Sequence, residues 1–325
     1  MPASISATAH LGNTGLEVTR LGLGGWVFGG PWEFGLGAQD DADSIKAMRA
    51  AVARGVNWID TAPVYGFGRS EAVIGRALRG LPAGDRPHVF TKCGLVWGEE
   101  RGPASKVGRP DSIRRECDAS LRRLGLDVVD LLQLHWPPED GTPLADAWGA
   151  LIDLRDEGKI RLAGVSNVSS EQLDACERVG HVDTLQAPLS LLRRSALESI
   201  LQAAKQHTGV IVYSPMQSGL LSGRWSRKRS EDLADDDSRR ESKLFTGAGL
   251  EYALALVDRL EPIADRHDVT VAELAIAWTL DQPGVTAAVV GARHSRQIEG
   301  WLGAGELVLD EETRGELLRA LAARA

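Results

Sequence analysis

The stretch GVNWIDTAPVYGFGRSEAVIGRALRG, residues 55–80, decides the fold. It begins at 56–60, where apolar Trp58 and Ile59 predict the end of a buried strand, and continues into residues 70–78, where apolar residues recur at helical spacing. Gly55 ends the preceding helical segment and Gly80 ends this one, as glycine commonly does at helix C-termini. The stretch is therefore one unit of strand, loop and helix.

Similar units follow one another along the 325 residues. Strands are predicted at 21–24, 56–60, 88–92, 128–135, 160–165, 184–187, 210–214 and 286–290, and helices at 43–54, 70–78, 112–124, 144–157, 169–179, 195–207, 250–266, 271–280 and 311–323. Such alternation implies a parallel sheet, and eight units in this length fit an α/β fold of the (β/α)8 TIM barrel class. An open doubly wound sheet is the alternative, but no GxGxxG follows the first strand.

The barrel is predicted to be a single domain that spans residues 1–325. A turn signal at Asn13-Thr14-Gly15 adds an N-terminal β-hairpin, and the last predicted helix closes the C-terminus. Residues 217–246 form a long polar loop, of which 226–243 is expected to be the most flexible part because it is rich in Arg, Asp, Glu and Ser.

Composition narrows the class of partner. Lys and Arg number 37 against 45 for Asp and Glu, and the net charge of −8 without a basic stripe argues against nucleic acid or an anionic membrane as partner. The first ten residues lack the pattern of a secretory signal, and no apolar run is long enough to cross a bilayer. The three cysteines have no CxxC spacing, which gives no metal signal and suits a reducing compartment. A cytoplasmic protein is expected.

Three consecutive predicted strands deliver polar side chains to one end of the barrel. Strand 56–60 ends in Asp60 with Tyr65 on its loop, strand 88–92 ends in Lys92, and strand 128–135 ends in His135. Active sites of these barrels lie at the C-terminal ends of the strands and on the loops that follow. The four side chains are therefore predicted to meet at one mouth.

Their chemistry is consistent with a proton donor for a carbonyl oxygen. A free phenol has a pKa of about 10, and a nearby lysine ammonium is expected to lower it. Asp60 could hold Lys92 charged, and His135 could bond to a substrate oxygen. Reduction of a carbonyl also needs a hydride, which no side chain supplies and which a nicotinamide cofactor usually provides.

Each residue also has an ordinary structural interpretation. Asp60 could be a turn former, Tyr65 a half-buried loop aromatic, Lys92 a side chain that reaches solvent, and His135 a core histidine. Their joint occurrence at one end of three strands favours catalysis. A barrel hydrolase or lyase that used Asp60 and His135 would need a metal site or a second acid, and the sequence shows no such ligand cluster.

The motifs that carry these residues resemble those of the aldo-keto reductases across nearly the whole chain. They are Asp60-Thr61-Ala62-Pro63-Val64-Tyr65-Gly66, Gly68-Arg69-Ser70-Glu71, Thr91-Lys92, Asp130-Leu131 with His135, Gly158 to Arg161, and Gly164 to Asn167. The general pattern looks most like the bacterial branch that includes inositol and sugar-related dehydrogenases. The resemblance implies a catalytic tetrad of Asp60, Tyr65, Lys92 and His135, with Tyr65 as general acid/base.

The resemblance also implies NADP(H) bound in extended form across the barrel mouth. The residues that match its contacts are Gly25, Trp26, Asp60, Ser166, Asn167, Gln186, Tyr213, Ser214, Pro215, Met216, Ser218, Gly219, Leu220, Ser222, Arg224, Gly291, Arg293 and Gln297. Arg293, at the start of a helix, suits a 2′-phosphate. Gly300-Trp301 stands where many relatives carry Glu-Asn, so NAD(H) is the alternative cofactor.

The substrate is expected above the nicotinamide, beside Tyr65 and His135. Its candidate walls are four tryptophans on loops that follow strands: Trp26, Trp32, Trp97 and Trp136. Such walls suit sugars, aromatic aldehydes or ketones alike. With the tetrad, the resemblance implies an NADP(H)-dependent carbonyl reductase or alcohol dehydrogenase that acts on a small-molecule carbonyl or sugar-like substrate. The alternative is a cofactor-binding regulatory module with little turnover. No metal and no particular oligomeric state is predicted.

Overall fold

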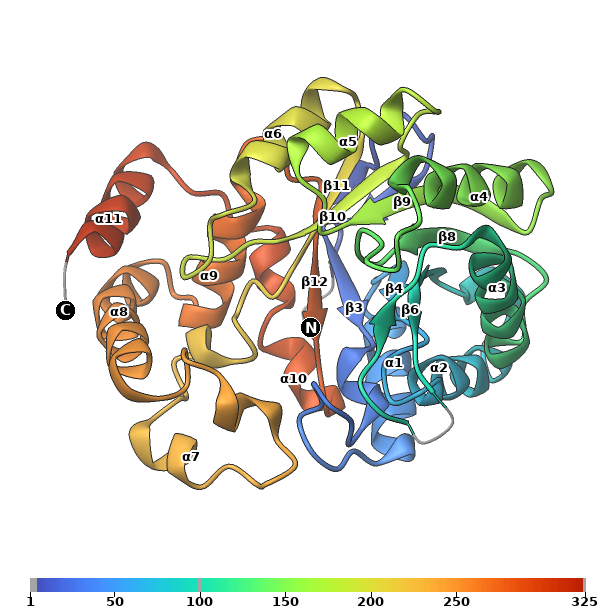
Figure 1. The fold of residues 1–325 in the computed structure, drawn as a ribbon. Coiled ribbons are helices and arrows are strands. Elements are labelled where there is room, and N and C mark those ends of the chain that lie inside the picture. The colour runs from blue at the N-terminus through green and yellow to red at the C-terminus, as the bar shows by residue number, and fades with distance from the viewer. Residues whose placement is uncertain (1–4, 99–100, 324–325) are drawn as a thin grey trace.

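The computed structural model describes residues 5–98 and 101–323. Eight parallel strands close into a barrel around which the helices are arranged (Figure 1). In barrel order from the N-terminus the strands are β3 (Leu21–Gly24), β4 (Trp58–Asp60), β5 (His88–Cys93), β8 (Val129–Leu134), β9 (Ile160–Ser166), β10 (Thr184–Pro188), β11 (Gly209–Tyr213) and β12 (Ala287–Gly291). The predicted (β/α)8 barrel is confirmed.

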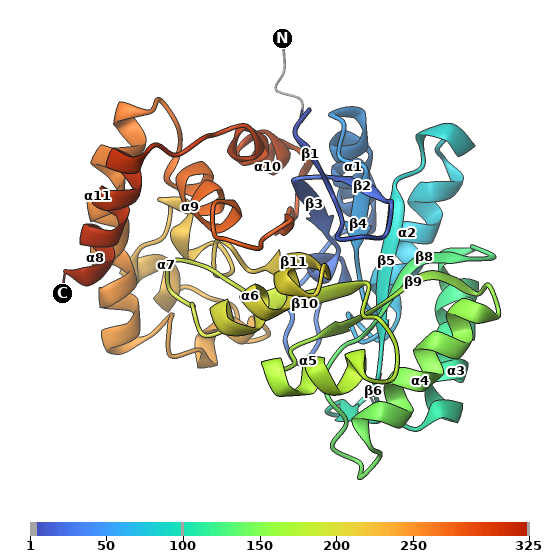
Figure 2. The same ribbon diagram turned by 90° about the horizontal axis from the view of Figure 1, so that it is seen from above.

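The α-helices of the described chain follow the predicted alternation. They are α1 (Asp41–Ala53), α2 (Arg69–Arg79), α3 (Pro110–Leu124), α4 (Leu144–Asp156), α5 (Ser170–Glu177), α6 (Leu197–Lys205), α7 (Arg227–Glu231), α8 (Gly247–Arg266), α9 (Val271–Leu280), α10 (Ser295–Glu299) and α11 (Glu311–Ala322). The helix at 169–179 was expected from a Ser-Ser-Glu start, and Ser169 does form a capping box, with Gln172. The C-terminal helix α11 packs beside α8 (Figures 1 and 2).

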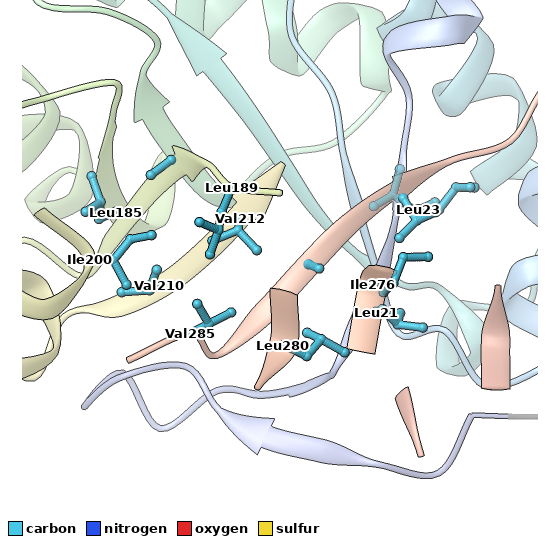
Figure 3. Close-up of a cluster of buried hydrophobic side chains, with 14 of the residues drawn as sticks. Leu21, Leu23, Leu185, Leu189, Ile200, Val210, Val212, Ile276, Leu280 and Val285 are labelled. Atoms are coloured by element: carbon cyan, nitrogen blue, oxygen red, sulfur yellow. The ribbon is translucent and has the colours of Figure 1, made fainter. Parts of the chain in front are cut away.

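Successive side chains of each barrel strand point alternately outward and inward, so the strands contribute to two hydrophobic cores. One set of buried apolar residues faces outward and packs under the helices, including Leu21, Leu23, Leu185, Val210 and Val212 (Figure 3). A second, smaller cluster contains Trp58, Phe90, Leu131 and Ile211 from strands of the barrel. Because successive side chains of a strand point to opposite faces, Asp60 and Lys92 lie on the same face as Trp58 and Phe90, one layer nearer the strand ends.

The N-terminal hairpin packs against the barrel interior. Strands β1 (Thr8–His10) and β2 (Glu17–Thr19) pair antiparallel around the predicted turn. Leu11 and Val18 are fully buried in the cluster that contains Trp58, and the Trp58 indole donates to the main-chain oxygen of Thr19 at 2.8 Å. A Cβ atom at Gly22 would lie 2.2 Å from the Trp58 ring, so this barrel strand needs glycine there. The hairpin therefore closes one end of the barrel and leaves the other for the site.

The connecting segments differ most from expectation. The loop predicted at 217–246 contains the short helix α7 and two 3-10 turns, η3 (Leu220–Ser222) and η4 (Ser238–Glu241). The small hairpin β6 (Leu95–Val96) with β7 (Ser105–Lys106), the 3-10 turns η1 (Trp26–Gly29), η2 (Ala83–Asp85) and η5 (Leu302–Gly305), and α10 were not predicted. The β1–β2 hairpin and β6 lie on opposite sides of the molecule (Figure 2). Within the described residues, every helix is too short or too polar to cross a membrane.

Candidate active site

A buried ion pair forms the base of the site. Lys92, near the end of β5, donates from Nζ to Oδ2 of Asp60 at 2.6 Å, and the two side chains are 1% and 5% exposed. Lys92 Nζ also donates to the main-chain oxygen of Thr61 at 3.0 Å. Gln186 of β10 donates to the other carboxylate oxygen of Asp60 at 2.7 Å. Both oxygens of the buried carboxylate thus have partners, as a charge in this environment requires.

Tyr65 lies above this pair on the loop between β4 and α2. The Lys92 ammonium is 5.4 Å from the centroid of the Tyr65 ring. The His135 ring, just after β8, meets the Tyr65 ring edge-on with centroids 5.9 Å apart. The structure therefore brings together the four side chains that the sequence predicted at the mouth, from three strands and one loop.

The surroundings set the protonation of these groups. Burial raises the pKa of Tyr65 well above its usual value, and the negative charge of Asp60 acts in the same direction. Burial lowers the pKa of Lys92, while Asp60 opposes that shift. Burial also lowers the pKa of His135 well below its usual range, helped by the charge of Lys92. The expectation that Lys92 lowers the pKa of Tyr65 is not met, because burial of the phenol raises that pKa and the negative charge of Asp60 also opposes ionisation. At neutral pH the phenol is therefore protonated and the imidazole is neutral.

A second polar group adjoins the tetrad at the ends of β9 and β11. The Asn167 amide donates to the main-chain oxygen of His135 and to Ser166 Oγ, each at 3.0 Å, and it accepts from the Tyr213 hydroxyl at 2.8 Å. Asn167 has a left-handed backbone, with φ of 60°. This conformation is uncommon outside glycine, although asparagine tolerates it better than most residues. These bonds anchor Tyr213 by its hydroxyl at the barrel end.

The loop after β11 contains several residues with a left-handed backbone conformation. Ser214, Gln217, Ser218 and Gly219 all have positive φ, and a Cβ atom at Gly219 would meet nothing within 4 Å. Successive backbone groups in such turns form anion-binding concavities. The remaining predicted cofactor residues of this region, Pro215, Met216, Leu220, Ser222 and Arg224, follow on the same loop and in η3. Of these, Arg224 is exposed.

Two further groups of predicted cofactor residues lie at the ends of β3 and β12, which are paired neighbours. Gly25 donates its N–H to the main-chain oxygen of Asp60 at 2.7 Å, and the half-buried Trp26 begins η1. Gly291 ends β12, and the Arg293 N–H donates to the Gln297 side chain at 2.6 Å. The Arg293 guanidinium donates to oxygens of residues 36–39. The predicted cofactor residues therefore lie in the barrel strands or in the segments that follow them, as far along as Arg224 beyond η3 and Gln297 in α10.

The four tryptophans occupy different surroundings. Trp32 packs against Tyr65 with ring centroids 5.8 Å apart. Trp97 packs against Phe67 at 5.6 Å and lines a cavity of about 270 Å³ with Pro63 and α3. Trp136 lies under Lys106 of β7, with Nζ 4.7 Å from the ring centroid. Trp32 is therefore in direct ring contact with a member of the tetrad.

Sequence reasoning missed several residues around the site. Phe34 meets Trp32 edge-on at 5.5 Å and is 53% exposed, so it extends the wall beside Tyr65. Glu71, fully buried, accepts from Thr91 Oγ1 and from Arg123 Nε, each at 2.6 Å. Glu71 stands in the quoted Gly68-Arg69-Ser70-Glu71 motif, which could have pointed to it. Nothing in the sequence marked Phe34.

The residues present fit a nicotinamide dinucleotide. The tethered Tyr213 offers an aromatic face, the loop after β11 offers turns and hydroxyls for a pyrophosphate, and Arg293 offers a guanidinium. Across residues 5–98 and 101–323, no group of three or more His, Cys, Asp or Glu side chains is arranged to hold a metal ion.

Comparison with known proteins agrees with this geometry. The sequence model described as "Aldo/keto reductase family" matches residues 20–321. Aldo-keto reductase YhdN of Bacillus subtilis (strain 168) is 36% identical over 292 residues, which are 89% of this chain and 86% of that protein. The NADH-specific methylglyoxal reductase of Escherichia coli (strain K12) is 35% identical over 302 residues, which are 89% of this chain and 90% of that protein. The solved structure of the glycerol dehydrogenase AKR11B4 from Gluconobacter oxydans has a TM-score of 0.87 at 37% identity and covers 97% of this chain and 95% of that one. The chain therefore belongs to the aldo/keto reductase family, as its motifs predicted.

Proposed function

We propose that this protein reduces small aldehydes or ketones, or oxidises the corresponding alcohols, with Tyr65 as the proton donor and acceptor. Membership of the family implies NAD(P)H-dependent carbonyl reduction. The observation that carries the assignment of Tyr65 is the buried Asp60–Lys92 pair beneath its ring, with Lys92 Nζ 5.4 Å from the ring centroid. When bound, the nicotinamide supplies the hydride.

Each member of the tetrad has a distinct task in this proposal. The phenol of Tyr65, whose pKa is raised by burial, carries the proton to the carbonyl oxygen. Lys92 places a positive charge where negative charge develops on that oxygen and on the phenol, and Asp60 fixes the ammonium. The neutral His135 orients the carbonyl oxygen through a hydrogen bond.

For the cofactor we propose NADP(H), with NAD(H) as the alternative. Tyr213 and Asn167 would hold the nicotinamide end, the loop after β11 the pyrophosphate, and Arg293 the 2′-phosphate. Arg293 supports NADP(H), because its guanidinium suits a phosphate. The name of the Escherichia coli relative supports NAD(H).

The substrate class is proposed from the wall beside Tyr65 and from the relatives. Trp32 and Phe34 border the phenol, and flat aromatic surfaces suit sugar-like as well as aromatic compounds. Methylglyoxal and glycerol, named for two relatives, are both small and polar. We therefore propose small hydroxylated or dicarbonyl compounds as the physiological substrates.

The test is the loss of reduced-nicotinamide absorbance with NADPH and with NADH, in the presence of methylglyoxal, glyceraldehyde or an aromatic aldehyde. The wild type should turn over at least one of these, and Tyr65→Phe should not. Dinucleotide binding without turnover of any of them would instead support a cofactor-binding regulatory module. Equal turnover by Tyr65→Phe would remove the assignment of the proton donor.

A further inference from the structure

Gln39 lies beside the adenosine end of the proposed cofactor site and has no role in the mechanism described above. It sits on the loop between η1 and α1 and is 7% exposed. Its side chain forms a reciprocal pair with Arg293: Arg293 Nε donates to Gln39 Oε1, and Gln39 Nε2 donates to the main-chain oxygen of Arg293, each at 3.0 Å. Gln39 Nε2 also donates to Ser44 Oγ at 3.1 Å, which orients the amide.

The other guanidinium nitrogens of Arg293 donate to the same loop. Nη1 donates to the main-chain oxygen of Leu36 at 3.2 Å, and Nη2 donates to that of Ala38. Each of the three guanidinium nitrogens is thus engaged by residues 36–39, and all three acceptors are uncharged. A phosphate offers charged oxygens, and hydrogen bonds between charged partners are roughly twice as strong as neutral ones.

We propose that Gln39 competes with the 2′-phosphate of NADP(H) for Arg293 and thereby sets the preference between NADP(H) and NAD(H). This inference rests on the proposed function. A dinucleotide with a free 2′-hydroxyl leaves the Gln39–Arg293 pair intact. Arg293 Nε has a single N–H, which Gln39 already holds, so a 2′-phosphate that binds the guanidinium side-on through Nε and one Nη displaces Gln39, and part of the phosphate's binding free energy offsets the loss of that pair.

The backbone of this loop is held independently of the Gln39 side chain. Leu36 forms an antiparallel bridge with Asp237, and the Ser238 N–H donates to the main-chain oxygen of Gly35 at 3.0 Å. On the other side, Arg69 donates from Nε to Asp41 at 3.0 Å. Substitution of Gln39 should therefore change the acceptor offered to Arg293 more than the course of the loop.

Two substitutions test the competition in opposite directions. Gln39→Met keeps the length of the side chain but removes the acceptor, and Gln39→Glu adds a carboxylate that binds Arg293 more strongly and repels a phosphate. Dissociation constants for NADPH and NADH are measured by quenching of protein fluorescence. Calorimetry with 2′,5′-ADP and 5′-AMP repeats the comparison without the nicotinamide. The ratio of NADPH to NADH affinity should rise about 3- to 10-fold in Gln39→Met, the range for loss of one net hydrogen bond, and fall by at least as much in Gln39→Glu.

The control is the same pair of substitutions in an Arg293→Met background, where neither should change the ratio. If Gln39→Met does not fold, Gln39→Glu, which keeps the shape and the acceptor oxygen, still tests the inference. An unchanged ratio in the folded variants, with both dinucleotides bound, would overturn the role of Gln39 alone. Failure of the wild type to bind either dinucleotide would overturn the proposed function itself.

Discussion

At the scale of the residue, the hydroxyl of Tyr65 can be removed without disturbing the charges beneath it. Tyr65→Phe leaves the Asp60–Lys92 pair in place, because the hydrogen bonds of that pair go to Gln186 and Thr61. We expect kcat to fall by about 10²- to 10⁴-fold, the usual contribution of a general acid. The dissociation constant for the dinucleotide and the free energy of unfolding should stay close to the wild-type values. Steady-state kinetics, a binding titration and urea denaturation check the three quantities; a variant that kept full kcat would show that another group donates the proton.

Lys92 differs from Tyr65 because its removal leaves the buried carboxylate of Asp60 without an opposite charge. In Lys92→Met the Asp60 carboxylate would keep Gln186 but lose its ammonium, and breaking a buried pair in this way typically costs about 3–5 kcal/mol. We expect loss of both turnover and stability. The double variant Asp60→Asn/Lys92→Met should recover most of the stability and none of the turnover, as measured by urea denaturation and kinetics. Wild-type stability in Lys92→Met would show that Asp60 is not a buried anion.

The tetrad could be predicted from the sequence because each member stands at a strand end or on the loop after it. The barrel topology then brings those ends together without further information. The direction of the Tyr65 pKa shift could not be predicted, since it depends first on how deeply the loop buries the phenol and then on the charge of Asp60 beside it, and no sequence pattern shows either. The Gln39–Arg293 pair joins residues 254 positions apart in the chain, and no local pattern marks such a contact.

At the scale of the element, α3 is connected to the end of β5 through one titratable side chain. Glu116 of α3 accepts from the Gly94 N–H at 2.8 Å and from Ser112 Oγ at 3.2 Å. Gly94 lies two residues after Lys92 and has φ of 85°. Burial raises the pKa of Glu116 from 4.5 to about 7.

This pKa predicts how Glu116 affects stability as the pH changes. Because the pKa is higher in the folded than in the unfolded protein, the stability that the protonated carboxyl contributes is present below the unfolded pKa and is lost as the pH rises through about 7. Glu116→Gln cannot ionise and keeps an acceptor for Gly94. The variant should therefore be more stable than the wild type by roughly 3 kcal/mol at about pH 8.5, and much closer to it at about pH 5. Urea denaturation at both values measures the difference; a gap that did not grow with pH would contradict the raised pKa.

The sequence predicted the elements whose apolar pattern extends over several residues, and it did not predict the shortest strands and helices. The barrel strands and the long helices have apolar runs or helical spacing that span several residues, and glycines such as Gly55 and Gly158 mark helix ends. The two-residue strands β6 and β7 and the five-residue helices α7 and α10 are too short for either pattern. Polar composition at 217–246 therefore indicated a loop where the structure has short helices. Arg239 of η4 links this turn to the segment before η3 by donating to the main-chain oxygen of Ser218.

At the scale of the whole molecule, the barrel separates stability from function along its axis. The β1–β2 hairpin closes one end, where Leu11 and Val18 pack with Trp58 and Phe90 in the inner cluster. The tetrad and the loops after β11 and β12 lie at the C-terminal ends of the strands. Residues at the N-terminal face of such barrels generally serve stability, and those at the C-terminal face serve chemistry.

Leu11→Ala tests this separation. Leu11 is fully buried, and a Leu to Ala change at such a position costs about 2–5 kcal/mol through lost burial and the cavity that remains. We expect the free energy of unfolding to fall by that amount, measured by urea denaturation, while kcat and the dissociation constant for the dinucleotide stay close to the wild-type values at a temperature where the variant is folded. Tyr65→Phe is the control with the opposite expected result, because it should keep the free energy of unfolding and lose turnover. A large change in dinucleotide affinity in Leu11→Ala would mean that packing at the hairpin end sets the positions of the strand ends that carry Asp60 and Lys92.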